Sequence, residues 1–165
     1  MFKEISVKDI KENLVGAIAD EWMLISAGNL ESHNMMTASW GFMGEIWNED
    51  SVVIAVRPQR YTMKFLDEND TFALSFYGDN KLVHKVCGSE SGRDVNKTEK
   101  TGLTPVCEED TVYFEEANKV IICKKQYVSR LDPEKFTDKE PLKCYPNEDY
   151  HYMIIGKIVK VLEKQ

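Results

Sequence analysis

Short apolar segments separated by turn-forming residues are the feature that most restricts how this chain can fold. The segment 51–57, SVVIAVR, is continuously apolar at its centre, which is typical of a strand buried on both faces. Other segments with the composition of strands lie at 22–28, 35–41, 71–77, 112–116, 118–131 and 152–163. Because they do not alternate regularly with long helices, the pattern favours a mainly β barrel or sandwich over a doubly wound parallel sheet.

A few helices are expected beside these strands. The N-terminal region predicts an amphipathic helix, with a capping box at its start and one apolar face, from Ser6, Asp9, Ile10, Leu14 and Ile18. Two shorter helices are expected at 61–69 and 80–86, and the second should end before Gly88. The polar segment 88–101 is predicted to be a long loop.

Length and charge limit the classes of protein that the chain can represent. A chain of 165 residues has room for one sizeable core, so residues 1–165 are predicted to form a single domain. The 21 Lys and Arg residues against 28 Asp and Glu residues give a net charge of -7, which argues against a nucleic-acid partner. No segment approaches the roughly 20 apolar residues of a membrane span, and the N-terminus does not resemble a signal peptide. A cytoplasmic protein without a membrane partner is therefore expected.

Metal and disulfide chemistry are not expected. The four cysteines lie far apart without a metal-ligand spacing, and a reducing compartment would keep them as thiols. The three histidines are also scattered, which argues against zinc.

The segment RPQRYT, at 57–62, has the residues of an anion site. Arg57 ends a buried strand, and Thr62 lies at the start of a short predicted helix, close to Arg60. Guanidinium groups, a hydroxyl and free backbone N–H groups suit a phosphate monoester. The alternative is that both arginines pair with surface carboxylates and that Thr62 is only an N-cap. The segment by itself does not separate these interpretations.

Two further segments favour an anionic, flat ligand. SGRDVNK, at 91–97, places basic residues around a flexible glycine, although a solvated loop with an Arg93–Asp94 bridge is the alternative. HNMMTASWG, at 33–41, has small side chains that let the backbone approach a flat heterocycle. Its alternative is an ordinary strand with Trp40 in the core. The common glycine-rich nucleotide motifs GxGxxG and GxxxxGK[ST] do not occur.

The ordered combination of motifs resembles the flavin reductase-like, FMN-binding split-barrel family, and within it the flavoredoxin-like branch. The motifs are N-x-M-T-A-S-W-G, R-P-Q-R-Y-T, F-x-L-S-F, S-G-R-D-x-x-K, T-G-L-T-P and D-Y-H-x-M-I-I-G. They extend from about Trp22 to Val161. The resemblance implies a six-stranded Greek-key split barrel, a homodimer, and noncovalently bound FMN near the subunit interface.

The resemblance also assigns roles to individual residues. Beside the isoalloxazine and the ribityl chain it places Asn34, Met36, Thr37, Ala38, Ser39 and Trp40. At the phosphate and on the neighbouring strand it places Arg57, Gln59, Arg60, Tyr61, Thr62, Ser75 and Phe76. In the loop that closes over the cofactor it places Ser91, Gly92, Arg93 and Lys97. His33 and Met35 depart from the family pattern, which puts the shape of the substrate face in doubt.

His151 is the one candidate catalytic residue. The resemblance places it close to the flavin, in its own subunit or from the partner, where it could control proton access or stack on a nicotinamide. Lys97 could stabilise the reduced flavin. The alternative for His151 is a histidine whose hydrogen bonds are satisfied by the backbone.

The implied cofactor carries the chemistry, so no acid–base pair in the protein is required. One expectation is an FMN-dependent oxidoreductase that moves electrons from NADH or NADPH to a flavin or another small-molecule acceptor. The second is an electron-transfer or flavin-carrier protein, reduced by a redox protein partner without nicotinamide activity. The third is a flavin-free barrel, which the intact RPQRYT and SGRDVNK segments disfavour.

Overall fold

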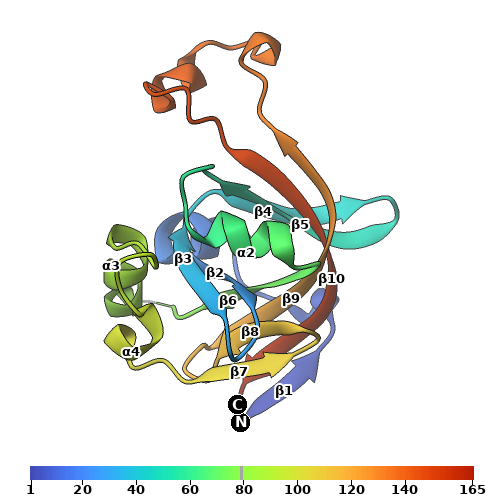
Figure 1. Cartoon of the computed structure of the whole chain (residues 1–165). Coiled ribbons are helices and arrows are strands. Elements are labelled where there is room, and N and C mark those ends of the chain that lie inside the picture. Colours follow the sequence, from blue (N-terminus) through green and yellow to red (C-terminus); the bar gives the residue numbers. More distant parts are fainter. Residues whose placement is uncertain (79) are drawn as a thin grey trace.

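A strongly curved antiparallel sheet of eight strands forms the body of the protein (Figure 1). The computed structural model describes residues 1–78 and 80–165. The strand order is β3-β2-β6-β9-β10-β5-β4, with β1 paired to β10. The bounds are β1 Phe2–Ile5, β2 Met23–Gly28, β3 His33–Ala38, β4 Gly41–Ile46, β5 Glu49–Val56, β6 Thr71–Phe76, β9 Lys119–Arg130 and β10 Tyr152–Lys164. A separate hairpin consists of β7 Pro105–Glu108 and β8 Thr111–Phe114.

Short helices occupy the connections between strands. The α-helices are α1 Leu14–Gly16, α2 Thr62–Glu68, α3 Lys81–Ser89 and α4 Lys97–Thr101. The other helical turns are η1 Val7–Asp9, the π-helix η2 Ala17–Glu21, η3 Pro133–Lys135 and η4 Glu140–Cys144. None of the helices in the described residues is long and apolar enough to cross a membrane.

The strands predicted from apolar composition are confirmed, and the structure contains additional strands whose sequences are not predominantly apolar. The main sheet has eight strands, not six. β1 and β4 were missed because β1 is short and carries charged residues, and β4 contains two glycines and is largely exposed. The strand predicted at 35–41 lies at His33–Ala38, so Trp40 falls just after it.

The helices predicted at 61–69 and 80–86 are confirmed as α2 and α3, whereas the N-terminal prediction fails because side-chain hydrogen bonds there determine the backbone. The single N-terminal helix is wrong: the Ser6 side chain accepts a hydrogen bond from the Lys8 N–H and closes only η1. The Asn13 side chain then starts α1 by accepting from two backbone N–H groups, as asparagine often does. The predicted stop at Gly88 and the predicted loop at 88–101 are also wrong in part, because α3 continues to Ser89 and α4 lies inside the loop.

Two hydrophobic clusters hold the sheet. One fills the inside of the curved sheet and includes Ile25, Ile54, Phe72 and Ile154, all fully buried. The other packs between the opposite face, α3 and the β7–β8 hairpin; it includes Leu24, Met35, Val83, Phe114 and Val120.

A glycine permits the close packing at a bulge between β9 and β10. The register shifts between Ile155 and Gly156, and a Cβ on Gly156 would lie 2.6 Å from Cζ of Phe72. Any larger residue would push Phe72 out of the core.

Residues 131–150, called the arm below, project beyond the barrel between β9 and β10 (Figure 1). Both flanking strands are long, and they pair with each other up to the base of the arm. The arm therefore returns His151 to the edge of the barrel, beside the end of β5.

The cysteines are free thiols: Cys87 and Cys123 are buried, and Cys107 and Cys144 are exposed. Within residues 1–78 and 80–165, no three His, Cys, Asp or Glu side chains are grouped as a metal site would require.

Candidate functional site

Two adjoining pockets bring most of the predicted site residues together. The outer pocket, of about 180 Å³, is lined by Met36, Thr37, Ala38, Ser39, Trp40, Ala55, Arg57, Arg60 and His151. The inner pocket, of about 210 Å³, is lined by Asn34, Met36, Gln59, Arg60, Tyr61, Thr62, Ser89, Glu90, Ser91, Gly92 and Lys97. Met36 and Arg60 belong to both, so the two pockets form one elongated site.

The strand β3 supplies one wall of this site because it lies at the end of the sheet. Among the described strands it pairs only with β2, so one of its edges keeps backbone N–H and C=O groups that the sheet does not use. Such groups can bind the polar edge of a ligand.

The inner pocket contains two cations whose hydrogen-bond partners are carbonyl groups. Arg60 donates to the carbonyl oxygens of Gly88 (3.2 Å) and Cys87 (3.4 Å) at the end of α3. Lys97, only 4% exposed, donates to the carbonyl oxygens of Met35 (2.9 Å) and Cys87 (3.1 Å). In the described part of the chain, neither cation lies within ion-pair distance of a carboxylate. Their charge is therefore available to an anion.

Burial has a clear electrostatic effect on these two cations. It lowers the pKa of Lys97 to about 8, and nearby Arg60 lowers it further, while Cys87 and Glu90 act in the opposite direction. Burial also lowers the pKa of Arg60. An anion in the inner pocket would favour both charged forms and relieve this cost.

The loop at 91–97 folds against the start of α2. Arg93 donates to the carbonyl oxygen of Gln59 (3.1 Å), and its guanidinium lies 4.8 Å from the centre of the Tyr61 ring. The Arg93–Asp94 bridge is not among the ion pairs of the described residues. A Cβ on Gly92 would lie 2.1 Å from Oδ1 of Asn34, so only glycine fits there.

Asn34 and Thr62 form a buried polar contact on the floor of the inner pocket. Nδ2 of Asn34 donates to Oγ1 of Thr62 at 2.8 Å, and Thr62 is fully buried. Because the Thr62 oxygen accepts this bond, its own hydroxyl proton remains available as a donor.

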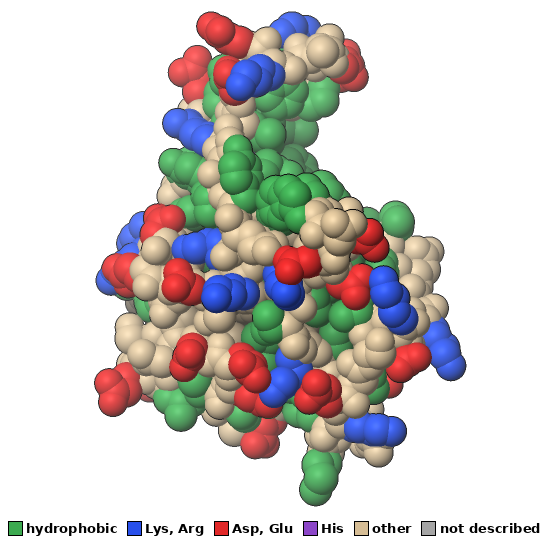
Figure 2. Space-filling view, turned by 90° about the vertical axis from the view of Figure 1, so that its right-hand side faces the viewer, with side chains coloured by type: hydrophobic (Ala, Val, Ile, Leu, Met, Phe, Trp, Pro, Cys, Tyr) green, Lys and Arg blue, Asp and Glu red, His purple; other side chains and the backbone are tan. Residues whose placement is uncertain are grey.

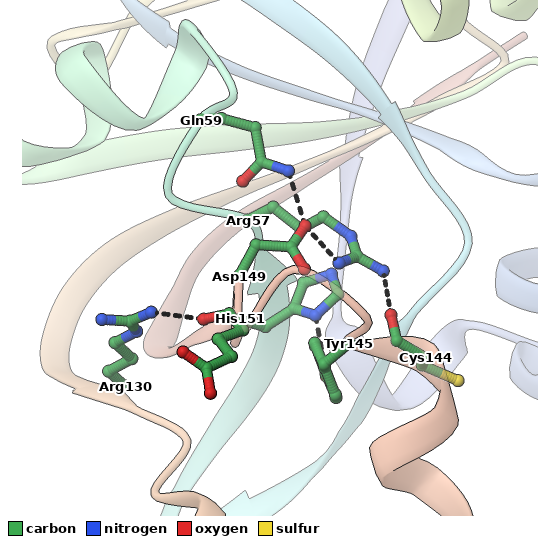
Figure 3. Close-up of polar contacts among 8 residues, drawn as sticks. Arg57, Gln59, Arg130, Cys144, Tyr145, Asp149 and His151 are labelled. Atoms are coloured by element: carbon green, nitrogen blue, oxygen red, sulfur yellow. Dashed lines mark hydrogen bonds and ion pairs between the residues drawn. The ribbon is translucent and has the colours of Figure 1, made fainter.

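Arg57 behaves differently from Arg60, although only two residues separate them. Arg57 Nη1 lies 2.5 Å from Oδ2 of Asp149, and Nη2 donates to the carbonyl oxygen of Cys144 at 3.0 Å (Figure 3). Gln59 donates to the same Asp149 oxygen at 2.7 Å. Hydrogen bonds from Gln59 and Arg57 lower the pKa of Asp149. The carboxylate interpretation is thus correct for Arg57, which ties the arm to the end of β5.

His151 and Trp40 form the far wall of the outer pocket. Their ring centres are 4.9 Å apart, and Nδ1 of His151 lies 2.8 Å from the hydroxyl of Tyr145. His151 is 6% exposed; burial, followed by the charge of Arg57, lowers its pKa to about 4. Trp40 is 44% exposed, so it is not a core residue.

Three predicted site residues line neither pocket: Arg93, which lies over the Tyr61 ring beside the inner pocket, and Ser75 and Phe76 on β6. Ser75 is fully buried on the face of β6 that carries Ala73 and Tyr77. Phe76 lines a separate small cavity with Leu14 and Ile121. Their position follows from the alternation of side chains along β6, which sequence spacing to the other motifs does not show.

Some residues of the site were not predicted. Ala55, Ser89 and Glu90 line the pockets. Asp149 belongs to the D-Y-H motif, but nothing local shows that it meets Arg57 across 92 positions of sequence. No sequence pattern indicated that Tyr145 lies next to the site.

The protein is a curved antiparallel β-sheet with a cation-containing site at its free edge. The sequence pattern of the flavin reductase-like domain matches residues 15–165, so the chain belongs to this family. The split-barrel fold is confirmed by solved structures. No curated protein matches the sequence.

Three solved structures illustrate the similarity. Flavoredoxin from Methanosarcina acetivorans has a TM-score of 0.69 at 19% identity, covering 88% of this chain and 69% of that one. An FMN-binding domain of a flavin reductases-like enzyme from Shewanella baltica has a TM-score of 0.69 at 14% identity, covering 99% and 77%. An NADH:FAD oxidoreductase of Streptomyces globisporus has a TM-score of 0.66 at 14% identity, covering 87% and 75%. At these identities the comparison establishes the fold, and the activity has to be argued from the site.

Proposed function

We propose that this protein binds FMN and acts as an FMN-dependent oxidoreductase. The observation that carries the proposal is the pair of cations in the inner pocket, Arg60 and Lys97, whose partners in the described part of the chain are all carbonyl groups. A phosphate monoester would compensate their charge through charge-assisted hydrogen bonds. The inner pocket opens through Met36 and Arg60 into the outer pocket, which offers the free edge of β3 and the ring of Trp40 to a flat ring system.

The residues present fit this ligand. Arg60, Lys97, Thr62 and Ser91 would hold the phosphate, and the absence of a side chain at Gly92 leaves the backbone close to the pocket. Arg57 is engaged by Asp149 and is assigned to anchoring the arm. Lys97 lines the inner pocket and not the outer one, so its proposed contact is the phosphate end and not the reduced ring.

Bound FMN supplies hydride and one-electron transfer. The protein's part is then to bind and orient the ligand: β3 presents backbone groups, and Trp40 and His151 limit the space at the outer wall. The proposed electron donor is NADH or NADPH, and the proposed acceptor is a flavin or another small molecule. The fold shared with an NADH:FAD oxidoreductase supports this assignment.

The second candidate is an electron-transfer or flavin-carrier protein reduced by a redox protein partner. An exposed aromatic residue at the outer pocket favours it: Trp40 is 44% exposed. An exposed tryptophan suits a protein docking surface next to the electron-transfer site.

Anaerobic mixing separates these candidates. The FMN-loaded protein is mixed in turn with NADH, NADPH and reduced ferredoxin, and the oxidised flavin absorption band is followed. Rapid bleaching by a nicotinamide is the expected result. Bleaching by ferredoxin alone would favour the electron-transfer protein, and a protein that does not bind FMN would contradict both.

We propose further that the protein forms a homodimer through the outer face of β4, β5, β10 and β9. Phe42, Val53, Ile155 and Tyr127 are cross-strand neighbours in one row on this face. Phe42 and Tyr127 are 59% and 51% exposed, and Figure 2 shows a hydrophobic patch on this side of the molecule, below the projecting arm. A second copy would bury this patch and place its own surface near Trp40.

Light scattering coupled to gel filtration tests the dimer. Phe42→Asp should convert it to a monomer, because a charge would be buried in the interface, whereas Leu82→Asp is a control at an exposed apolar position in α3, outside this face. A wild-type monomer at micromolar concentration would contradict the proposal. The single domain and the cytoplasmic location remain predictions from the sequence.

A further inference from the structure

Tyr145 and His151 form a buried hydrogen-bonded pair at the wall of the outer pocket. Their side chains meet at 2.8 Å, and the residues are 7% and 6% exposed. Nε2, the second ring nitrogen of His151, has no hydrogen-bond partner among the described residues, although the residue lines the pocket. A ring nitrogen of this kind at a pocket wall can form a hydrogen bond with a ligand or with water in the pocket.

The direction of the Tyr145–His151 hydrogen bond follows from the available partners. Tyr145 has one hydroxyl proton, and among the described residues its only hydrogen-bond acceptor is Nδ1 of His151. If the imidazole donated instead, the phenol proton would be buried without an acceptor, which costs free energy. Tyr145 is therefore the donor, and the neutral imidazole carries its proton on Nε2.

The ionisation states agree with this arrangement. Burial raises the pKa of Tyr145, so the phenol keeps its proton at neutral pH. Burial, and then the charge of Arg57, lowers the pKa of His151 to about 4, while Asp149 acts in the opposite direction. Both groups are thus neutral at pH 7.

The arm holds Tyr145 in place from several sides. Arg57 is bound to Asp149 and to the carbonyl oxygen of Cys144, on both sides of Tyr145 in the sequence (Figure 3). The Arg57 guanidinium also lies 5.2 Å from the centre of the Tyr145 ring. The centres of the Tyr145 and Tyr150 rings are 4.9 Å apart. The Tyr145 hydroxyl is consequently fixed relative to His151.

We propose that Tyr145 is a positioning residue that fixes His151 as an Nε2–H donor directed into the outer pocket, so that the site selects electron acceptors carrying a carbonyl oxygen. The choice of electron acceptors as the ligand class rests on the proposed oxidoreductase function. The tautomer and the selection of a hydrogen-bond acceptor rest on the geometry of this chain alone. Tyr145 acts through His151 and does not line the pocket itself.

Nitrogen NMR of the imidazole rings tests the tautomer without any flavin. In the flavin-free protein at pH 7, the His151 resonances should show the proton on Nε2. Tyr145→Phe removes the donor and should shift the population toward the Nδ1–H form, whereas Tyr150→Phe, which removes a neighbouring hydroxyl, should leave it unchanged. A wild-type His151 protonated on Nδ1, or an unchanged tautomer in Tyr145→Phe, would overturn the proposal.

Binding of a matched pair of probes tests the selectivity. Acetophenone carries a carbonyl oxygen and ethylbenzene does not; their binding to the flavin-free protein is followed by the indole N–H resonance of Trp40. We expect the wild-type protein to prefer the ketone, and Tyr145→Phe to reduce this preference by about three- to tenfold, the worth of one hydrogen bond. Equal preference in the two proteins would overturn the assignment. Because both experiments are read without flavin, failure to bind FMN would contradict the proposed function and leave this test intact.

Discussion

The two arginines of RPQRYT reach the two ends of one site and have different surroundings. Arg57, at the outer pocket, is paired with Asp149 at 2.5 Å and holds the arm. Arg60, at the inner pocket, binds only the carbonyl oxygens at the end of α3 among residues 1–78 and 80–165. The same side chain therefore serves as a structural anchor where it pairs with a carboxylate, and as a candidate anion ligand where no carboxylate of the described residues lies within ion-pair distance. The role of each arginine is therefore determined by the residues that distant segments of the chain bring next to it.

The comparison extends to the rest of each pocket. The inner pocket has fixed, buried polar groups, such as Lys97 and the Asn34–Thr62 contact. The outer pocket is walled by rings, and Trp40 is partly exposed. We expect the inner pocket to determine affinity for the phosphate and the outer pocket to determine which molecule reacts.

The largest effect is expected from Lys97→Met, which removes the buried cation while keeping much of its volume. FMN affinity should fall by at least about 100-fold, because charge-assisted hydrogen bonds to a buried phosphate are lost. The carbonyl groups of Met35 and Cys87 would also lose their donor, so the melting temperature should fall.

Fluorescence titration with FMN and thermal unfolding measure the two consequences of Lys97→Met. Lys143→Met is the matched control, because Lys143 is an exposed residue paired with Glu140, and neither residue lines either pocket. Its effect on FMN affinity should be less than about threefold. Equal losses in the two variants would show that the position of Lys97 is unimportant.

Acid pH should destabilise the protein through His84 and His151. Burial lowers the pKa of each to about 4, below the ordinary value of 6.5. Between pH 6.5 and 4 the unfolded chain binds protons that the folded protein does not, so the free energy of unfolding should fall as the pH is lowered. The slope is at most about 1.4 kcal/mol per pH unit for each histidine.

Urea unfolding at several pH values across this window measures that slope. His84→Gln should make it smaller, because one of the two depressed histidines is gone. Carboxylates with lowered pKa values, such as Glu12, change the free energy of unfolding mainly below their ordinary pKa of 4.5. They therefore do not contribute to the slope in the upper part of this pH range. A free energy of unfolding that stays constant from pH 6.5 to 4.5 would contradict the burial of both rings.

A smaller effect on binding, but a clear effect on the arm, is expected from Arg57→Ala. The arm loses its bonds to Asp149 and Cys144, so its amide hydrogens should exchange faster. FMN affinity should change by less than about threefold, since a partly exposed ion pair contributes little to the rest of the fold. Hydrogen exchange by mass spectrometry and flavin titration give the two readouts. Unchanged exchange at 131–150 would show that Arg57 does not anchor the arm.

Sequence patterns predicted the parts of this molecule that depend on local order. The apolar runs of β5, β6, β9 and β10 identified strands, and RPQRYT, HNMMTASWG and SGRDVNK identified most of the pocket residues. β4 was missed because its exposed, glycine-containing sequence lacks the apolar pattern of a buried strand.

Contacts between distant segments could not be predicted from such local patterns. The role of Arg57 depends on Asp149, and the surroundings of His151 depend on Tyr145 in an arm without regular strands. The orientation of Ser75 depends on which face of β6 meets the second cluster. Each of these depends on tertiary packing, which local propensity does not determine.

The most direct test of the account compares FMN with riboflavin, which lacks the phosphate, in the wild type, Arg60→Ala and Arg57→Ala. The dissociation constants are measured by flavin fluorescence titration. Arg60→Ala should weaken FMN binding by about 10- to 100-fold and leave riboflavin binding nearly unchanged, because one charged hydrogen-bond partner of the phosphate is removed. Arg57→Ala should affect the two flavins equally and weakly. Equal losses for FMN and riboflavin in Arg60→Ala would contradict the assignment of the inner pocket to the phosphate.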